Sequence, residues 1–255
     1  MTDYSGYLIC SDIDGTLVNS AGEISAKNLK AIRSFVDGGG LFTLATGRMP
    51  EHARTFPFLP NAPLIAVNGT VIYDIHKRRI LREYPLDSFY KDVFSYIDKK
   101  HISGIENFEV YTPSGWVLEE ERGVAEFYDV YENEKVYKYL FRFSRASEAF
   151  EARIDLEEKF GHRFLFDRSW PFGLEMHSPE SGKGNCARVL KEEFCPDVHT
   201  VIAIGDYEND ISLFKAADLS YATDNAPEHV KAEADKIAPS NNEDAVWYVI
   251  NSINS

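Results

Sequence analysis

Acidic residues follow two apolar segments that lie far apart in the chain. Asp12 and Asp14 come directly after the apolar run 7–10, and Asp206 follows a second apolar run at 201–204. Both runs have the length and composition of a buried strand. In open α/β sheets, sites form at the carboxyl ends of the strands, where the strand order reverses. The two acidic loops are therefore predicted to hold a divalent cation together.

The first acidic loop carries two carboxylates separated by a single residue. If the backbone stays extended beyond the strand, the side chains of Asp12 and Asp14 point the same way. One carboxylate could then attack an electrophile while the other supplies or removes a proton. Attack on phosphorus would give an acyl phosphate, which is activated for hydrolysis. Gly15 allows the chain to turn sharply away from the strand.

Polar residues elsewhere in the chain could complete such a site. Thr46, after another predicted strand, offers a hydroxyl and a backbone N–H to a phosphoryl oxygen. Lys183 offers a cation to the nucleophile and to the transferring group, whose developing charge needs stabilisation. Asp206 offers a hard oxygen ligand to Mg²⁺. Asn209 and Asp210 open the next predicted helix and can orient the metal ligands or the lysine.

Taken in order, these residues resemble the haloacid dehalogenase superfamily of phosphatases. The matching segments are DIDGTL at 12–17, LATGR at 44–48, SGKG at 181–184 and GDYEND at 205–210. The long insert between the second and third segments resembles the large α/β cap of the Cof-type subfamily. The resemblance thus covers essentially the whole chain, by motifs in the core and by arrangement in the cap.

The resemblance implies a role for each matching residue. Asp12 would be the nucleophile and Asp14 the general acid/base, while Thr46 and Lys183 would stabilise the phosphate and the nucleophile. Mg²⁺ would be held by Asp12, the backbone carbonyl of Asp14, and Asp206. Asn209 and Asp210 would support these ligands.

Further residues are candidates for binding the substrate, together with Thr46 and Lys183. Gly47 and Arg48 follow Thr46 directly. Arg48 could contact the substrate, or it could be a solvent-exposed arginine. Asn68 precedes Gly69 after a third predicted strand, so it could face the substrate or belong merely to a turn.

Strand and helix signals divide the chain into three blocks. The first and last show short apolar strands alternating with helices, which is typical of βαβ units and a parallel sheet. The middle block combines helices at 86–99 and 147–160 with a hairpin at 109–118 and strands at 164–166 and 172–176. We therefore predict an α/β protein: a Rossmann-like parallel-sheet core from 1–84 and 181–255, and an inserted α+β cap domain at 85–180.

Composition narrows the possible partners and location. The net charge of −14 argues against nucleic acid and anionic membranes. No apolar stretch approaches the roughly 18 residues of a membrane span, and the N-terminus lacks the features of a secretory signal. The three cysteines are odd in number and lack metal-ligand spacing, which favours reduced thiols and a cytoplasmic location. The oligomeric state is left open between monomer and dimer.

The predicted function is a Mg²⁺-dependent phosphomonoesterase that acts through an aspartyl phosphate on a small sugar phosphate or a similar phosphorylated metabolite. A phosphomutase would form the same intermediate and return the group to the sugar. A dehalogenase would not need Asp14, and a non-catalytic phospho-ligand sensor would be expected to lack a motif residue. A dinucleotide oxidoreductase is excluded, because no G-x-G-x-x-G follows the first strand.

Overall fold

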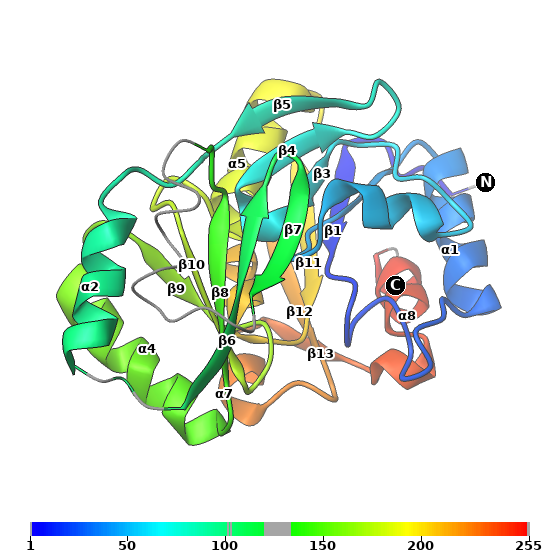
Figure 1. Ribbon diagram of the computed structural model, residues 1–255. Helices are drawn as coiled ribbons and strands as arrows, with labels where there is room; N and C mark the ends of the chain where they lie inside the picture. The colour runs from blue at the N-terminus through cyan, green and yellow to red at the C-terminus, as the bar shows by residue number, and fades with distance from the viewer. Residues whose placement is uncertain (1, 101, 103, 120–133, 254–255) are drawn as a thin grey trace. The chain divides into compact units, whose positions relative to one another are not determined.

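The computed structural model describes residues 2–100, 102, 104–119 and 134–253 (Figure 1). The chain forms two compact units, one from Met1–Arg82 with Lys183–Ser255 and the other from Glu83–Gly182. The chain passes from one unit to the other after residues 82 and 182. The predicted boundaries lie two residues away, after residues 84 and 180. Among the described residues, no helix has both the length and the apolar character needed to cross a membrane.

A five-stranded parallel sheet forms the centre of the first unit, in agreement with the predicted fold class (Figure 1). Its strand order is β13-β12-β11-β1-β2, with bounds of Lys236–Ala238, Leu219–Thr223, Thr200–Gly205, Tyr7–Ser11 and Leu41–Leu44. The strands read as apolar runs because both faces of this sheet are covered; β1 is buried from its second residue onward.

The register of this sheet determines which loops meet at its edge. Ser11, the last residue of β1, pairs with Ile204 of β11 on one side and with Leu44 of β2 on the other. The loops after β1, β2 and β11 therefore begin at the same level. Because β1 connects to β2 on one side and lies against β11 on the other, this is the point where the strand order reverses.

Helices from both ends of the chain pack together beside this sheet. In α1 (Ala26–Asp37), the Ser25 side chain accepts a hydrogen bond from the amide of Asn28 at 3.0 Å and caps the first turn. The Asn28 side chain in turn accepts from the amide of Trp247 in α8 (Ala245–Ser252) at 2.8 Å. Figure 1 shows α1 in blue and α8 in red, side by side.

The remaining helical segments of the first unit are short. They are η1 (Pro50–Thr55), η2 (Val67–Gly69), α5 (Lys183–Val189), the π-helical η3 (Leu190–Phe194), η4 (Glu208–Asp210), α6 (Ile211–Ala216), α7 (Glu228–Lys231) and η5 (Asn241–Glu243). The segment that begins at Pro50, η1, is a short 3₁₀ helix. It stops because Phe56 precedes a proline and is extended, with φ −81° and ψ 155°.

A small antiparallel sheet follows the second strand of the core. It consists of β3 (Leu64–Ala66), β4 (Val71–Asp74) and β5 (Arg79–Glu83) in that order. β3 was predicted from the sequence, whereas β4 and β5 were not. β5 has no buried residue and carries three charges in five positions, so it lacks the apolar pattern on which that prediction depended.

The second unit is an antiparallel sheet packed against two helices, α2 (Tyr90–Lys100) and α4 (Ala146–Phe160). The strand order β7-β6-β8-β10-β9 corresponds to Gly115–Glu119, Ile105–Thr112, Lys138–Phe143, Gly173–His177 and Leu165–Asp167. The predicted hairpin is β6–β7. β8 was not predicted from the sequence. Its Tyr139 and Phe141 pack around Phe94 of α2, with ring centroids 4.8 Å and 5.6 Å away.

Candidate active site

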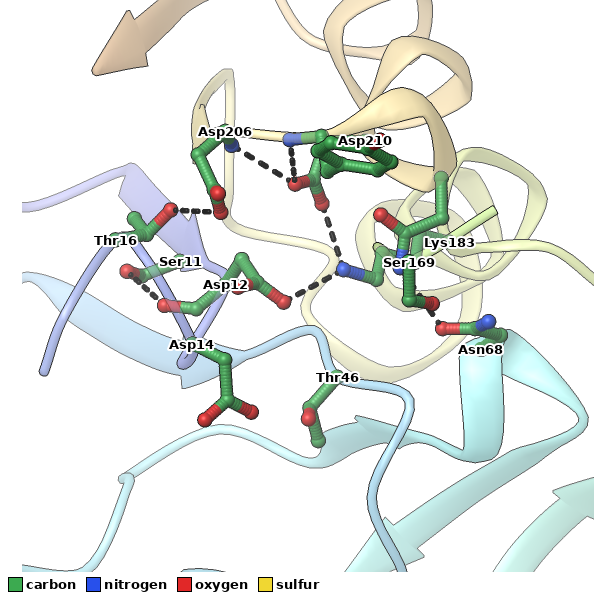
Figure 2. Close-up of polar contacts among 12 residues, drawn as sticks. Ser11, Asp12, Asp14, Thr16, Thr46, Asn68, Ser169, Lys183, Asp206 and Asp210 are labelled. Atoms are coloured by element: carbon green, nitrogen blue, oxygen red, sulfur yellow. Dashed lines mark hydrogen bonds and ion pairs between the residues drawn. The ribbon is translucent and has the colours of Figure 1, made fainter. Parts of the chain in front are cut away.

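The carboxylates predicted to form a site meet at the edge of the parallel sheet. The Asp12 amide donates to the carbonyl oxygen of Ile204 at 2.9 Å, so the loop after β1 starts as a continuation of the ladder with β11. Asp206 comes directly after β11, and Asp210 ends η4. Oxygen atoms of Asp12, Asp206 and Asp210 all lie within 4.8 Å of one another. Figure 2 shows their side chains converging.

A buried lysine ties these carboxylates together. Lys183 has no exposed surface, and its Nζ donates to Asp12 Oδ1 at 2.7 Å and to Asp210 Oδ1 at 2.6 Å (Figure 2). Burial alone would lower the pKa of Lys183, but the two carboxylates outweigh it and hold that pKa above its ordinary value. Lys183 is therefore a permanent cation in this site.

Close helix packing places this lysine. Lys183 begins α5, which packs on α6. A Cβ at Gly184 would lie 2.0 Å from the carbonyl oxygen of Ser212, so only glycine allows this approach. The Gly184 amide also donates to Ser212 Oγ at 3.2 Å. The glycine after the lysine is thus required by packing.

Asp210 is occupied by protein groups on both oxygens. Besides the bond from Lys183, its Oδ2 accepts from the amides of Asp206 and Tyr207 at 3.0 Å and 3.3 Å. These bonds fix the turn that presents Asp206. Asp210 is thereby suited to orienting the lysine and the loop, which leaves Asp12 and Asp206 as the carboxylates with free coordination capacity.

Two residues of the first loop shape the surroundings of Asp206. The Thr16 hydroxyl donates to Asp206 Oδ1 at 3.0 Å, a contact that the sequence analysis did not assign. Gly15 has φ +79°, and a Cβ there would lie 2.3 Å from Asp206 Oδ2. The signal for this contact in the sequence was the threonine that directly follows the Asp-Gly turn. Its hydroxyl faces the loop that follows the neighbouring strand, β11.

The charge balance of this cluster suits a divalent cation. Two carboxylates, Asp12 and Asp210, bind the one ammonium group and Asp206 lies beside them, so negative charge remains uncompensated in a buried place. Burial raises the pKa of Asp12 to about 7, an effect that Lys183 opposes and Asp210 reinforces. Burial, reinforced by Asp12 and Asp210, raises the pKa of Asp206 to about 8. A hard cation with oxygen ligands would relieve this repulsion.

Asp14 departs from the expected orientation. The amides of Leu17 and Val18 both donate to the Ile13 carbonyl oxygen at 3.0 Å, so the backbone turns and does not stay extended. Figure 2 shows the Asp14 side chain directed away from the Asp12 carboxylate, and it is not part of the carboxylate cluster. Its carboxylate instead pairs with the guanidinium of Arg48 through two bonds.

The loop after β2 uses its backbone differently from the prediction. The Thr46 amide donates to the Ile65 carbonyl oxygen at 2.8 Å, so this N–H is already engaged within the sheet. The Thr46 hydroxyl accepts from the Arg48 amide at 3.1 Å and can still donate its own proton. Gly47 lies between them, half-buried. Of the two groups expected from Thr46, the hydroxyl is the one suited to a ligand.

Asn68 connects two loops of the site. Its Oδ1 accepts from Asn209 Nδ2 at 3.2 Å, and its amide donates to the Thr46 carbonyl oxygen at 2.9 Å. Val67 and Asn68 both have left-handed backbone, with φ 52° and 54°. Such a conformation is costly for a β-branched residue such as Val67. The Asn-Gly pair is therefore part of a strained loop that braces Thr46.

Comparison with known proteins identifies the family of the chain. The profile of the haloacid dehalogenase-like hydrolase family matches residues 9–250. The 5-amino-6-(5-phospho-D-ribitylamino)uracil phosphatase YwtE of Bacillus subtilis (strain 168) is 28% identical, over 96% of this chain and 97% of its own. The pyridoxal phosphate phosphatase YbhA of Escherichia coli (strain K12) is 23% identical, over 96% of this chain and 97% of its own.

The fold also has counterparts among solved structures. The subclass IIB sugar phosphatase BT4131 superposes with a TM-score of 0.78 and 18% identity, covering 97% of this chain and 99% of that one. The chain belongs to the haloacid dehalogenase-like hydrolase family, as its sequence motifs predicted. The relatives named here are phosphatases, and this chain matches nearly their whole length. The prediction of a phosphatase is therefore confirmed.

Proposed function

We propose that the protein is a Mg²⁺-dependent phosphomonoesterase that forms an acyl phosphate of Asp12, an aspartyl phosphate, as its intermediate. The observation that carries this proposal is the buried bridge from Lys183 to Asp12 and Asp210, beside Asp206. The bridge holds the Asp12 carboxylate in one orientation and leaves its second oxygen for attack. A lysine cation beside the nucleophile also opposes the repulsion between the carboxylate and an incoming phosphate.

The reaction needs two displacements at phosphorus. Asp12 attacks, the bond from phosphorus to the ester oxygen breaks, and Asp14 gives its proton to the departing oxygen. Asp14 then takes a proton from water, which attacks the same phosphorus, so that inorganic phosphate leaves and Asp12 is regenerated. Lys183 and the Thr46 hydroxyl stabilise the oxygens of the transferring group.

Mg²⁺, when bound, would supply positive charge against the phosphoryl oxygens. The ligands we propose for it are Asp12, the Asp14 backbone carbonyl and Asp206, since both carboxylates lie in the cluster and neither is fully neutralised there. Asn209 and Asp210 support these ligands from the following turn: Asp210 binds the Asp206 amide, and Asn209 binds Asn68.

The substrate we propose is a small phosphorylated metabolite such as a sugar phosphate, bound at its phosphate by Thr46, Gly47, Arg48 and Lys183. The YwtE relative acts, by its name, on a phosphate carried by a ribityl chain, which supports a polyol or sugar ester. We propose that residues 85–180 form a cap that selects this substrate. Three buried, unpaired cysteines are consistent with a reducing compartment, and we propose the cytoplasm.

A phosphate-release assay tests the proposed function. We expect turnover of 4-nitrophenyl phosphate and of at least one sugar phosphate with Mg²⁺, and loss of turnover in excess chelator, because the acidic cluster then repels the phosphate dianion. Undiminished turnover in chelator would contradict the role of the metal. Isomerised sugar phosphate without free phosphate would instead identify a phosphomutase.

The stabilisation of the fold by Mg²⁺ should increase with pH. Because the pKa values of Asp12 and Asp206 are raised to about 7 and about 8 from 3.8, the folded metal-free protein holds more protons than the unfolded chain between these limits. The contribution of these two carboxylates to stability then falls as the pH rises from about 4 to about 8. Mg²⁺ replaces the protons, so the rise in Tm that it causes should grow with pH.

Melting curves at pH 5.5, 6.5 and 7.5, with Mg²⁺ or chelator, measure this effect. Asp206→Asn, which cannot ionise at this position, should lose the part of the pH dependence that Asp206 contributes and most of the Mg²⁺-induced rise in Tm, while the part from Asp12 remains. A rise in Tm of equal size at all three pH values would show that the carboxylates are already ionised without metal.

A further inference from the structure

The ion pair between Asp14 and Arg48 holds the Asp14 carboxylate, the proposed acid/base group, away from the position in which it would act. Arg48 Nε donates to Asp14 Oδ2 at 2.6 Å, and its Nη2 donates to Asp14 Oδ1 at 2.7 Å. Both oxygens of the carboxylate are engaged by one planar guanidinium. In this arrangement the Asp14 side chain is directed away from Asp12 (Figure 2), so it does not face the group that Asp12 would attack.

Arg48 is anchored by its backbone to the loop that would bind phosphate. Its amide donates to Thr46 Oγ1 at 3.1 Å, and its carbonyl oxygen accepts from the Val67 amide at 3.0 Å. The backbone of Arg48 is thus fixed beside Thr46, and movement of its charge must come from the long side chain. A guanidinium on this loop can serve either Asp14 or an oxyanion held by Thr46.

The pair also lies where it can rearrange. Asp14 and Arg48 line a cavity of about 380 Å³ within the first unit, with His52, Val18, Ile24 and Phe56 among its other walls. The side chains of Arg48 and Asp14 are 45% and 52% exposed. Ion pairs this exposed contribute little stability, so a stronger anion can replace the carboxylate.

A phosphate ester is such an anion. It carries up to two negative charges, and its oxygens match the fork of an arginine in the same bidentate way as a carboxylate does. We propose that Arg48 exchanges partners: it holds Asp14 turned away in the free enzyme and transfers to the substrate phosphate on binding, which releases Asp14 toward the leaving-group oxygen. Arg48 is then both a phosphate ligand and a positioning residue for the acid/base group.

This inference rests on the proposed function, since it assigns Asp14 a task in that reaction. The exchange has a thermodynamic consequence that does not need turnover. Phosphate binding must break the Asp14–Arg48 pair, so the pair weakens the affinity for phosphate. Removing Asp14 relieves that cost only when Arg48 is present. If the pair stays intact in the complex, the charges act independently, and removing Asp14 has the same effect with or without Arg48.

A double-mutant cycle on phosphate binding tests the exchange. The dissociation constant of inorganic phosphate is measured by titration calorimetry at saturating Mg²⁺ for the parent, Asp14→Asn, Arg48→Gln and the double variant. We expect Asp14→Asn to tighten phosphate binding about threefold more in the parent than in the Arg48→Gln background. Equal factors in the two backgrounds would overturn the proposal, as would no tightening in the parent.

Two further arms keep the result decisive. Arg54→Gln removes an exposed arginine from η1, the segment that follows Arg48, and should leave the effect of Asp14→Asn unchanged. If Arg48→Gln binds phosphate too weakly to measure, a crystal structure with Mg²⁺ and beryllium trifluoride decides. Arg48 on the fluorides supports the exchange, and Arg48 still on Asp14 overturns it. A parent that binds phosphate but hydrolyses no ester would reject the proposed function, while the cycle on phosphate binding would still decide whether Arg48 exchanges partners.

Discussion

Asp12→Asn is expected to abolish phosphate release and to prevent formation of a phosphorylated enzyme. An amide is a poor nucleophile, so the first displacement at phosphorus should not occur, and the loss of kcat should be about 10⁴-fold or more. The fold should survive, because the amide still offers an oxygen to the Lys183 ammonium 2.7 Å away. Rapid acid quenching after mixing with a ³²P-labelled ester measures the covalent intermediate directly.

Asp14→Asn is the matched control, since it removes one carboxylate from the same loop and leaves the nucleophile. It should retain labelling by activated esters and lose about 10²–10⁴-fold in turnover. The loss should be larger for a sugar phosphate than for a nitrophenyl ester, because nitrophenolate departs without a proton. Labelling of Asp12→Asn at the parent level would mean that another residue is the nucleophile.

The meeting of the carboxylates could be predicted from the sequence because parallel strands leave little freedom in where their ends lie. Asp12 and Asp206 each follow an apolar run directly, and the pairing of Ser11 with Ile204 brings the two loops to the same level. Lys183 was expected to offer its cation to the nucleophile, and it is found between Asp12 and Asp210. Short-range pattern and sheet geometry together suffice for this part of the site.

The orientation of Asp14 could not be predicted in the same way. Whether the backbone after Asp12 stays extended depends on the hydrogen bonds to the Ile13 carbonyl oxygen. The alternation of apolar and polar residues does not predict these bonds. Once the chain turns, the exposed Asp14 carboxylate pairs with a nearby cation, which here is the guanidinium of Arg48. The sequence left Arg48 open between solvent exposure and contact with the substrate. In the free enzyme its partner is Asp14.

Strand β8 shows a second reason for failure. Its alternation places Tyr139 and Phe141 toward the helices, while Lys138 lies on the other face with only 1% of its side chain exposed, in an ion pair with Glu175. A buried lysine reads as a surface residue until its partner on another strand is known. Local pattern therefore underestimates strands whose second face is polar and buried.

Lys183→Met should cause the second large effect, in both activity and stability. It leaves Asp12 and Asp210 buried without their shared cation, and breaking a buried ion pair from one side costs about 3–5 kcal/mol in the free energy of unfolding. The loss of kcat should be about 10²–10³-fold, as expected when one group that stabilises transition-state charge is removed. Urea unfolding and phosphate release measure the two effects separately.

The matched control is Lys191→Met, which removes a lysine paired with Asp218 at 2.9 Å but exposed over 33% of its side chain. That variant should lose less than about 1 kcal/mol and keep its activity. The stability lost in Lys183→Met should also be recovered in part as the pH falls, because without the ammonium the carboxylates hold their protons at higher pH. An unfolding midpoint for Lys183→Met that matched Lys191→Met at neutral pH would show that the three carboxylates do not depend on this cation, and that their charge is balanced by another group.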